Sequence, residues 1–156
     1  MDARKEDLSL QEAANLLLEE CRTILPGIQA LFGFQLIAIF SAEFDEKLSF
    51  GEQVLHLGAI GLVVLAVVLI MTPAAYHRQT GPTKVDSAFI RVTSRAVLVA
   101  MVALMCGLTV DFYIVAAVIL LQTKWAIFLA ALLFVFIVIL WFMFPRMRAR
   151  RMFIDN

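Results

Sequence analysis

Four stretches of the chain are predominantly apolar and long enough to cross a bilayer. A helix needs about 20 apolar residues to span about 30 Å of hydrocarbon. Windows of that length with few charges lie at about 24–42, 54–76, 96–121 and 125–144. Each must be helical, because backbone groups in lipid have to be satisfied within the segment. The pattern predicts an all-α integral membrane protein, a four-transmembrane-helix antiparallel bundle that forms a single membrane domain.

An amphipathic segment precedes the first span. Ser9 and Glu12 have the spacing of a capping box, and apolar residues then recur at helical spacing as far as Leu25. The polar face is acidic and carries Glu12, Glu19 and Glu20. We therefore expect an amphipathic cytoplasmic helix over 8–25. Its acidic face favours docking on the protein's own basic segments, and the alternative is a solvated helix that lies at the interface by its apolar face alone.

Helix-breaking residues and short connections separate the predicted elements. Pro26-Gly27 predicts a kink or break between the amphipathic helix and the first span. Gly81-Pro82 predicts a turn between the second and third spans. Only Gln122–Lys124 separates the last two spans, which predicts a tight hairpin. Thr72-Pro73 predicts a kink whose threonine hydroxyl bonds back to the helix.

The positions of lysine and arginine predict the orientation of the chain. Of the 13 such residues, all but Lys47 and Lys124 lie in the N-terminal segment, between the second and third spans, or in 145–156. Positively charged loops stay in the cytoplasm, so both termini are expected there and 145–156 is expected to form a basic cytoplasmic tail. The acidic N-terminal segment lacks a basic n-region, so no cleavable signal is expected.

Composition supports a membrane protein and excludes several functional classes. The chain has 156 residues, of which 62% are hydrophobic and 17% charged, whereas soluble domains are about 45–50% apolar. Its formal net charge of zero gives no basic field for nucleic acid. Cys21 and Cys106 lack the spacing of a metal site. No GxSxG, HExxH or phosphate-loop motif occurs, so we expect neither an enzyme nor a cofactor or metal.

Asp111 is the one ionisable residue that must lie well inside a span. At about 1.5 Å per residue it is about 22 Å from Ala96 and about 15 Å from Leu121. A lone carboxylate there costs at least about 2.5–3.5 kcal/mol, so it needs a partner, water or a proton. Small residues on the same helix face let another helix approach and cover it; they are Ala100, Ala103 and Gly107.

Glutamines of the first span are the predicted polar neighbours. Gln35 lies at a depth similar to that of Asp111, which predicts a hydrogen bond between the two side chains. Gln29 lies nearer the cytoplasmic side, where it is placed either to satisfy carbonyl groups freed by Pro26 or to contact Arg95 or Arg91. Two interpretations of Asp111 remain open at this point. It is either a structural contact in a tight bundle or a group that handles protons or cations.

Other titratable residues are interpreted more simply. His56 and His77 lie towards opposite membrane faces and cannot share a metal, so each is interpreted as an interfacial polar residue rather than a ligand. The outer loop is acidic and can attract cations, although a solvated loop has the same composition. Its acidic residues are Glu43, Asp45, Glu46 and Glu52.

Two motifs resemble a known family. The segments ECRTILPGIQALFGFQ, at 20–35, and TPAAYHR, at 72–78, resemble a family of small bacterial four-span membrane proteins of unknown function. Some members carry the automatic label sodium:proton antiporter. The resemblance covers most of the chain and implies a bacterial inner-membrane protein. It also places a second candidate site at the cytoplasmic ends of the first two spans, formed by Glu20, Arg22, Pro26, Gln29, His77 and Arg78.

Two functional hypotheses follow. In the first, the protein transports protons or sodium ions, with Asp111 as the titrating group, Gln35 as its partner and the acidic loop as an entrance. In the second, it is a non-transporting membrane scaffold or accessory subunit, whose acidic N-terminal helix and Arg146–Arg151 bind partners or anionic lipid. Four spans leave little room for a pathway in one copy, so transport is expected to need a homo-oligomer or a partner complex in the bilayer.

Overall fold

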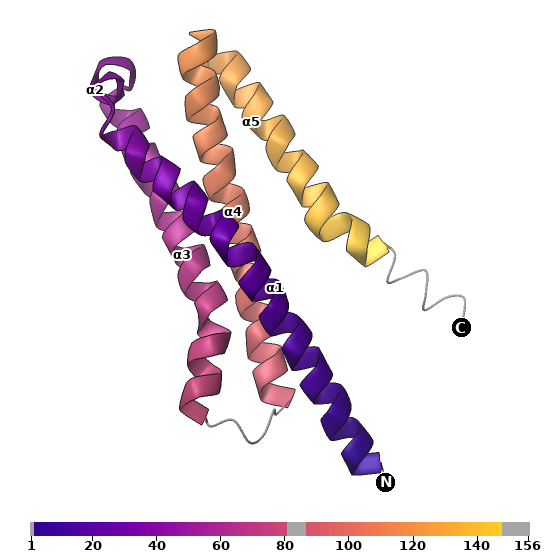
Figure 1. Cartoon of the computed structure of the whole chain (residues 1–156). Helices are drawn as coiled ribbons and strands as arrows, with labels where there is room; N and C mark the ends of the chain where they lie inside the picture. The colour runs from indigo at the N-terminus through magenta and orange to yellow at the C-terminus, as the bar shows by residue number, and fades with distance from the viewer. Residues whose placement is uncertain (1, 81–86, 148–156) are drawn as a thin grey trace. The chain divides into compact units, whose positions relative to one another are not determined.

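The computed structural model describes residues 2–80 and 87–147, and these residues are almost entirely helical (Figure 1). The elements in chain order are α1 (Asp2–Ile39), α2 (Glu43–Lys47), α3 (Phe50–Thr80), α4 (Ser87–Leu120), α5 (Thr123–Val138) and the π-helical turn η1 (Ile139–Met143). Within these two ranges the chain contains no strand. The predicted Gly81-Pro82 turn and the tail from 148 onwards lie outside the described residues.

Four helical stretches are long and apolar enough to cross a membrane. They are Leu10–Ile39, Phe50–Tyr76, Ala88–Leu120 and Thr123–Met147. Each contains most of one predicted span, so the prediction of an all-α, multi-pass membrane protein with four spans is confirmed. Several helices exceed the hydrocarbon thickness, since the 38 residues of α1 extend about 57 Å at 1.5 Å per residue. Such helices tilt or continue beyond the bilayer.

The start and the continuity of α1 differ from the prediction. The helix begins at Asp2, before the predicted cap at Ser9, and runs unbroken through Pro26 to Ile39. Of the predicted kink or break at Pro26-Gly27, the break is therefore wrong, and the kink stays a prediction. Proline removes one backbone donor, and membrane helices tolerate this loss because neighbouring polar groups and local adjustment satisfy the freed carbonyl. The predicted amphipathic helix and first span are parts of one helix.

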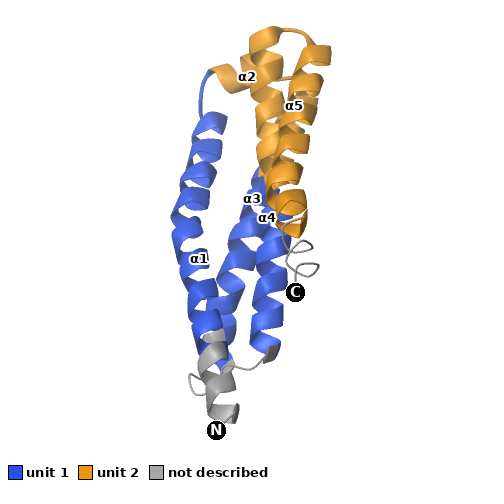
Figure 2. Cartoon of the chain, turned by 90° about the vertical axis from the view of Figure 1, so that its right-hand side faces the viewer, with its two compact units in different colours: residues 1–42, 60–104 blue, residues 43–59, 105–156 orange. Residues whose placement is uncertain are grey.

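The chain divides into two compact units, which Figure 2 shows in different colours. Unit 1 contains residues 1–42 and 60–104. In this unit α1, α3 and α4 form a helical bundle, whose buried core consists of Cys21, Ile28, Val63, Ala66, Ile70, Ala100 and Ala103. The three alanines let the helices approach closely. The prediction that Ala100 and Ala103 face another helix is confirmed.

The amphipathic pattern at the start of α1 is also present in unit 1. Ala14 and Cys21 are buried, whereas the side chains of Glu12, Glu19 and Glu20 are exposed. Towards the C-terminal end of α3, the hydroxyl group of Thr72 donates a hydrogen bond to the carbonyl oxygen of Val68 at 2.9 Å. The predicted back-bond beside Pro73 is thus confirmed.

Unit 2 contains residues 43–59 and 105–156. A capping box starts α3: the backbone N–H of Ser49 donates to Oε2 of Glu52 at 2.8 Å, and the Glu52 N–H donates to Oγ of Ser49 at 3.4 Å. Only Leu121 and Gln122 separate α4 from α5, with Leu121 in the left-handed region at φ 52°. This confirms the predicted tight hairpin.

Candidate functional site

A histidine and an aspartate from different helices meet inside unit 2. Nδ1 of His56, on α3, lies 3.2 Å from Oδ1 of Asp111, on α4. The two side chains are 9% and 19% exposed. If the imidazole is protonated and the carboxyl group ionised, the contact is an ion pair. If the imidazole is neutral, Nδ1 donates in one tautomer, and in the other it accepts a hydrogen bond from a protonated carboxyl group. His56 is thus a polar partner of the kind that the carboxylate of Asp111 requires inside an apolar span.

Both residues lie within the membrane-crossing stretches. His56 is about 9 Å along α3 from Phe50, and Asp111 is about 14 Å back along α4 from Leu120, at 1.5 Å per residue. Because α3 begins and α4 ends in unit 2, these two depths bring the side chains to a similar level. Both members of the pair therefore lie within the apolar helices α3 and α4, not in a loop.

Hydrogen-bonding groups lead from the α2 surface towards His56. The side-chain amide of Gln53 donates to Oδ1 of Asp45 at 3.3 Å and to the carbonyl oxygen of Leu48 at 3.2 Å. Gln53 and His56 are three residues apart on α3, so they are neighbours on one helix face. Asp45 is exposed, Gln53 is half-buried and His56 is buried. The ring of Phe44 covers His56, with centroids 5.6 Å apart at 59°.

A hollow of about 390 Å³ opens at the same end of unit 2. It is lined by Glu46, Lys47, Glu52, Ala117, Val118 and Leu121. Lys47 forms an ion pair with Glu43 one turn earlier on α2. The remaining carboxylates leave this end acidic, as the sequence predicts for the outer loop, and an acidic hollow raises the local concentration of cations.

The structure places the other predicted residues of this site as follows. The side chain of His56, which the sequence predicted to be an interfacial polar residue, is buried and turns inward to the carboxylate of Asp111, whereas its depth in the membrane stays a prediction. Gln35 is buried in unit 1. Its predicted hydrogen bond with Asp111 would join residues of the two units and stays a prediction. Gln29 is exposed, and its predicted contact with the carbonyls freed by Pro26 also stays a prediction.

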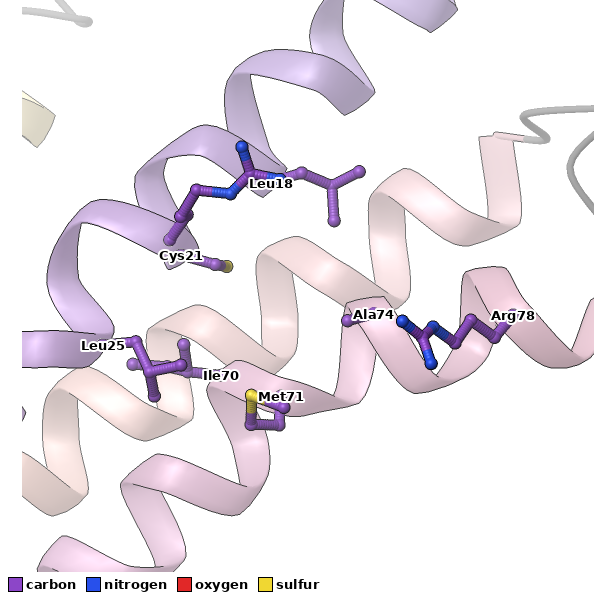
Figure 3. A pocket seen from close by; sticks show the side chains of 8 residues that line it. Leu18, Cys21, Leu25, Ile70, Met71, Ala74 and Arg78 are labelled. Atoms are coloured by element: carbon purple, nitrogen blue, oxygen red, sulfur yellow. The ribbon is translucent and has the colours of Figure 1, made fainter. Parts of the chain in front are cut away.

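The second candidate site is partly assembled in unit 1. Arg22 and Arg78 line one pocket of about 300 Å³ between α1 and α3 (Figure 3). The rest of its wall is apolar or carries a thiol, and consists of Leu18, Cys21, Leu25, Ile70, Met71 and Ala74. Glu20 instead lines a hollow on another face of α1. Pro26 is exposed, and the side chain of His77 lies outside the described residues.

The arrangement of possible metal ligands in residues 2–80 and 87–147 does not favour a metal site. No group of three or more histidine, cysteine, aspartate or glutamate side chains there is arranged to hold a metal ion. Cys21 and Cys106 are both free thiols. The His56–Asp111 pair is thus a two-residue arrangement, suited to sharing a proton rather than to enclosing a metal.

A family model described as a family of unknown function, DUF6328, matches residues 6–145. The match includes both the His56–Asp111 pair and the Arg22 and Arg78 pocket. It confirms the resemblance to a family of unknown function, while the sodium:proton transport implied by the label stays a prediction. Comparisons with curated proteins and with solved structures give no match.

Proposed function

The chain belongs to DUF6328, a family of unknown function, and from its own residues we propose that it carries protons across a membrane. The observation that supports this proposal is the contact of 3.2 Å between Nδ1 of His56 and Oδ1 of Asp111 inside apolar helices. Ionisable residues within membrane spans are costly and mark proton relays in many transporters. Histidine is also the side chain that exchanges protons most readily near neutral pH.

The surroundings of the pair support an entrance from the α2 end. Protons gather at the acidic surface of α2 and at the hollow beside Glu46 and Glu52. Gln53 precedes His56 by about one helical turn on α3, and its side chain donates a hydrogen bond to Asp45. Polar groups thus extend from the exposed Asp45 towards the imidazole. His56 takes up a proton and shares it with the carboxylate of Asp111. Release of this proton on the other side of the membrane completes the transfer. If proton movement is coupled to sodium ions moving the opposite way, the same activity becomes sodium:proton exchange.

The setting of this activity is part of the proposal. The protein lies in a bacterial inner membrane with both termini in the cytoplasm and α2 outside, as the positions of lysine and arginine favour. It works as a homo-oligomer or with a membrane partner, because four spans enclose little space. It moves ions without covalent chemistry and thus is not an enzyme.

The test is proton flux in proteoliposomes that contain the purified full chain. A pH gradient, and separately a sodium gradient, is imposed, and a trapped dye reports the internal pH. Asp111→Asn keeps a polar side chain of similar size but cannot titrate, and His56→Gln removes the imidazole. Both are expected to reduce flux to the level of empty liposomes. Thr109→Val is the control, since Thr109 lies near Asp111 on α4 and only donates to the carbonyl of Met105.

Each outcome of the flux test is decisive. Flux in the wild type and in Thr109→Val, lost in both site variants, supports the proposal. Flux that persists in Asp111→Asn means that the pair is not the carrier. No flux in the wild type under either gradient, with circular dichroism and gel filtration that match a folded protein, excludes transport and leaves the scaffold or accessory subunit as the better hypothesis.

A further inference from the structure

The pocket between α1 and α3 in unit 1 combines an apolar wall with two arginines. Leu25, Ile70 and Met71 provide apolar surface, and Arg22 and Arg78 add two guanidinium groups to the lining. Neither arginine forms a hydrogen bond or an ion pair with any residue that the structure describes. Guanidinium groups bind phosphate through two parallel hydrogen bonds, so two free guanidinium groups beside apolar surface suit an amphiphile with an anionic head.

The acidic residues Glu19 and Glu20 of α1 do not line this pocket. Leu18, Cys21, Arg22 and Leu25 have the i, i+3, i+4, i+7 spacing of a single helix face. Glu19 and Glu20 fall on other faces and line a separate hollow with Leu16, Thr23 and Ile24. The formal charges within the pocket lining are therefore all positive.

The side chain of Arg78 is directed towards the pocket. Figure 3 shows it lying back along α3 in the direction of Ala74, whose side chain is also in the lining. Long side chains in helices adopt this direction because the alternative χ1 near +60° would drive them into the preceding turn. The aliphatic stem of Arg78 thus adds apolar surface beside its guanidinium group.

We propose that this pocket binds an anionic phospholipid of the surrounding bilayer. The phosphate contacts the guanidinium groups of Arg22 and Arg78, and an acyl chain lies against Leu25, Ile70 and Met71. A lipid fits better than a free phosphate ion because most of the wall is apolar, and burial of acyl chain gains free energy that an inorganic ion lacks. Basic pockets between membrane helices bind lipid head groups in this way. The proposal does not depend on proton transport, since its residues belong to unit 1 and the His56–Asp111 pair to unit 2.

The proposal is tested by native mass spectrometry of the full chain in an uncharged detergent. The protein is titrated with dioleoyl-phosphatidylglycerol and, in parallel, with dioleoyl-phosphatidylcholine, which has the same chains but no net charge. Phosphatidylglycerol is expected to bind more tightly. Arg22→Gln and Arg78→Gln are each expected to weaken its binding about fivefold, and the double variant about 25-fold. The charge-matched control is the double variant Arg95→Gln, Arg146→Gln, expected to change binding less than twofold, since both residues are exposed and outside the pocket lining.

A second pair of variants separates the pocket from general surface charge. Ala74→Phe and Met71→Trp fill the pocket and keep both arginines, and both positions are exposed enough to accept a larger side chain. Each is expected to weaken phosphatidylglycerol binding at least tenfold without changing thermal unfolding. The proposal would be overturned if Ala74→Phe and Met71→Trp both bound phosphatidylglycerol as tightly as the wild type. It would also be overturned if the double variant of the pocket arginines and the double variant of the control arginines lost the same amount of binding. Equal binding of the two lipids would overturn it as well, as would displacement of the lipid by inorganic phosphate, which would point to a free anion.

Discussion

The imidazole of His56 and the carboxylate of Asp111 satisfy each other inside unit 2, with Nδ1 and Oδ1 3.2 Å apart. The two residues are far apart in sequence and come from separate helices, so their contact fixes α3 against α4 in addition to any role in proton transfer. A buried polar group that loses its partner retains the full cost of desolvation. Measurements of stability and the proposed flux assay therefore report on the same two side chains in different ways.

A double-mutant cycle measures the coupling between these residues. His56→Leu and Asp111→Leu are each expected to lower the free energy of unfolding by about 1–3 kcal/mol, because each removes the contact between the two side chains and deprives the remaining polar group of this partner. The double variant removes both polar groups and is expected to lose less than the sum, with a coupling of about 1 kcal/mol or more. Unfolding in mixed dodecyl sulfate micelles, followed by circular dichroism, measures all four proteins. Strictly additive losses would show that the two side chains do not depend on each other.

The fold was predictable from the sequence where lipid allows only one answer. Apolar windows of span length must be helical, and all four are. The ends of the helices were less predictable, because polar residues such as Asp2 and Ser87 form the same backbone hydrogen bonds as apolar ones once a helix extends beyond the hydrocarbon. The break predicted at Pro26 does not occur, for a related reason. The missing donor of the proline costs one hydrogen bond, which does not decide the path of a helix of this length.

The candidate sites were predictable only in part. Asp111 stands out because a charge inside a span is expensive. His56 was missed because depth along a helix does not tell which residue of a neighbouring helix faces the acid, and Gln35 fits the same depth. Arg22 and Arg78 were predicted near the same membrane surface, but only the packing of α1 on α3 brings them into one pocket.

The hairpin between α4 and α5 predicts the effect of substitutions at Leu121. This residue has φ 52° and is 87% exposed, so it packs little and adopts a conformation that costs L-residues about 1–2 kcal/mol. Leu121→Gly is expected to raise the free energy of unfolding by about 0.5–1 kcal/mol, since glycine adopts this φ freely but loses more entropy on folding. Leu121→Val is expected to lower it by about 1 kcal/mol, because a β-branched side chain tolerates positive φ poorly. The same micelle titration measures both, and a stabilising valine would contradict the assigned conformation.

Gln53 tests whether the polar residues above His56 form part of the proton path. Gln53→Met keeps the length of the side chain but removes the amide that donates to Asp45 and to the carbonyl of Leu48. If Asp45 delivers protons towards His56, this variant is expected to slow proton flux by about tenfold or less, the equivalent of one or two hydrogen bonds, without abolishing it. Val54→Met is the matched control, since the neighbouring Val54 is exposed and carries no polar group. Flux in proteoliposomes should be normal in the control. Normal flux in Gln53→Met as well would mean that protons reach His56 without passing Gln53, for instance from the hollow beside Glu52.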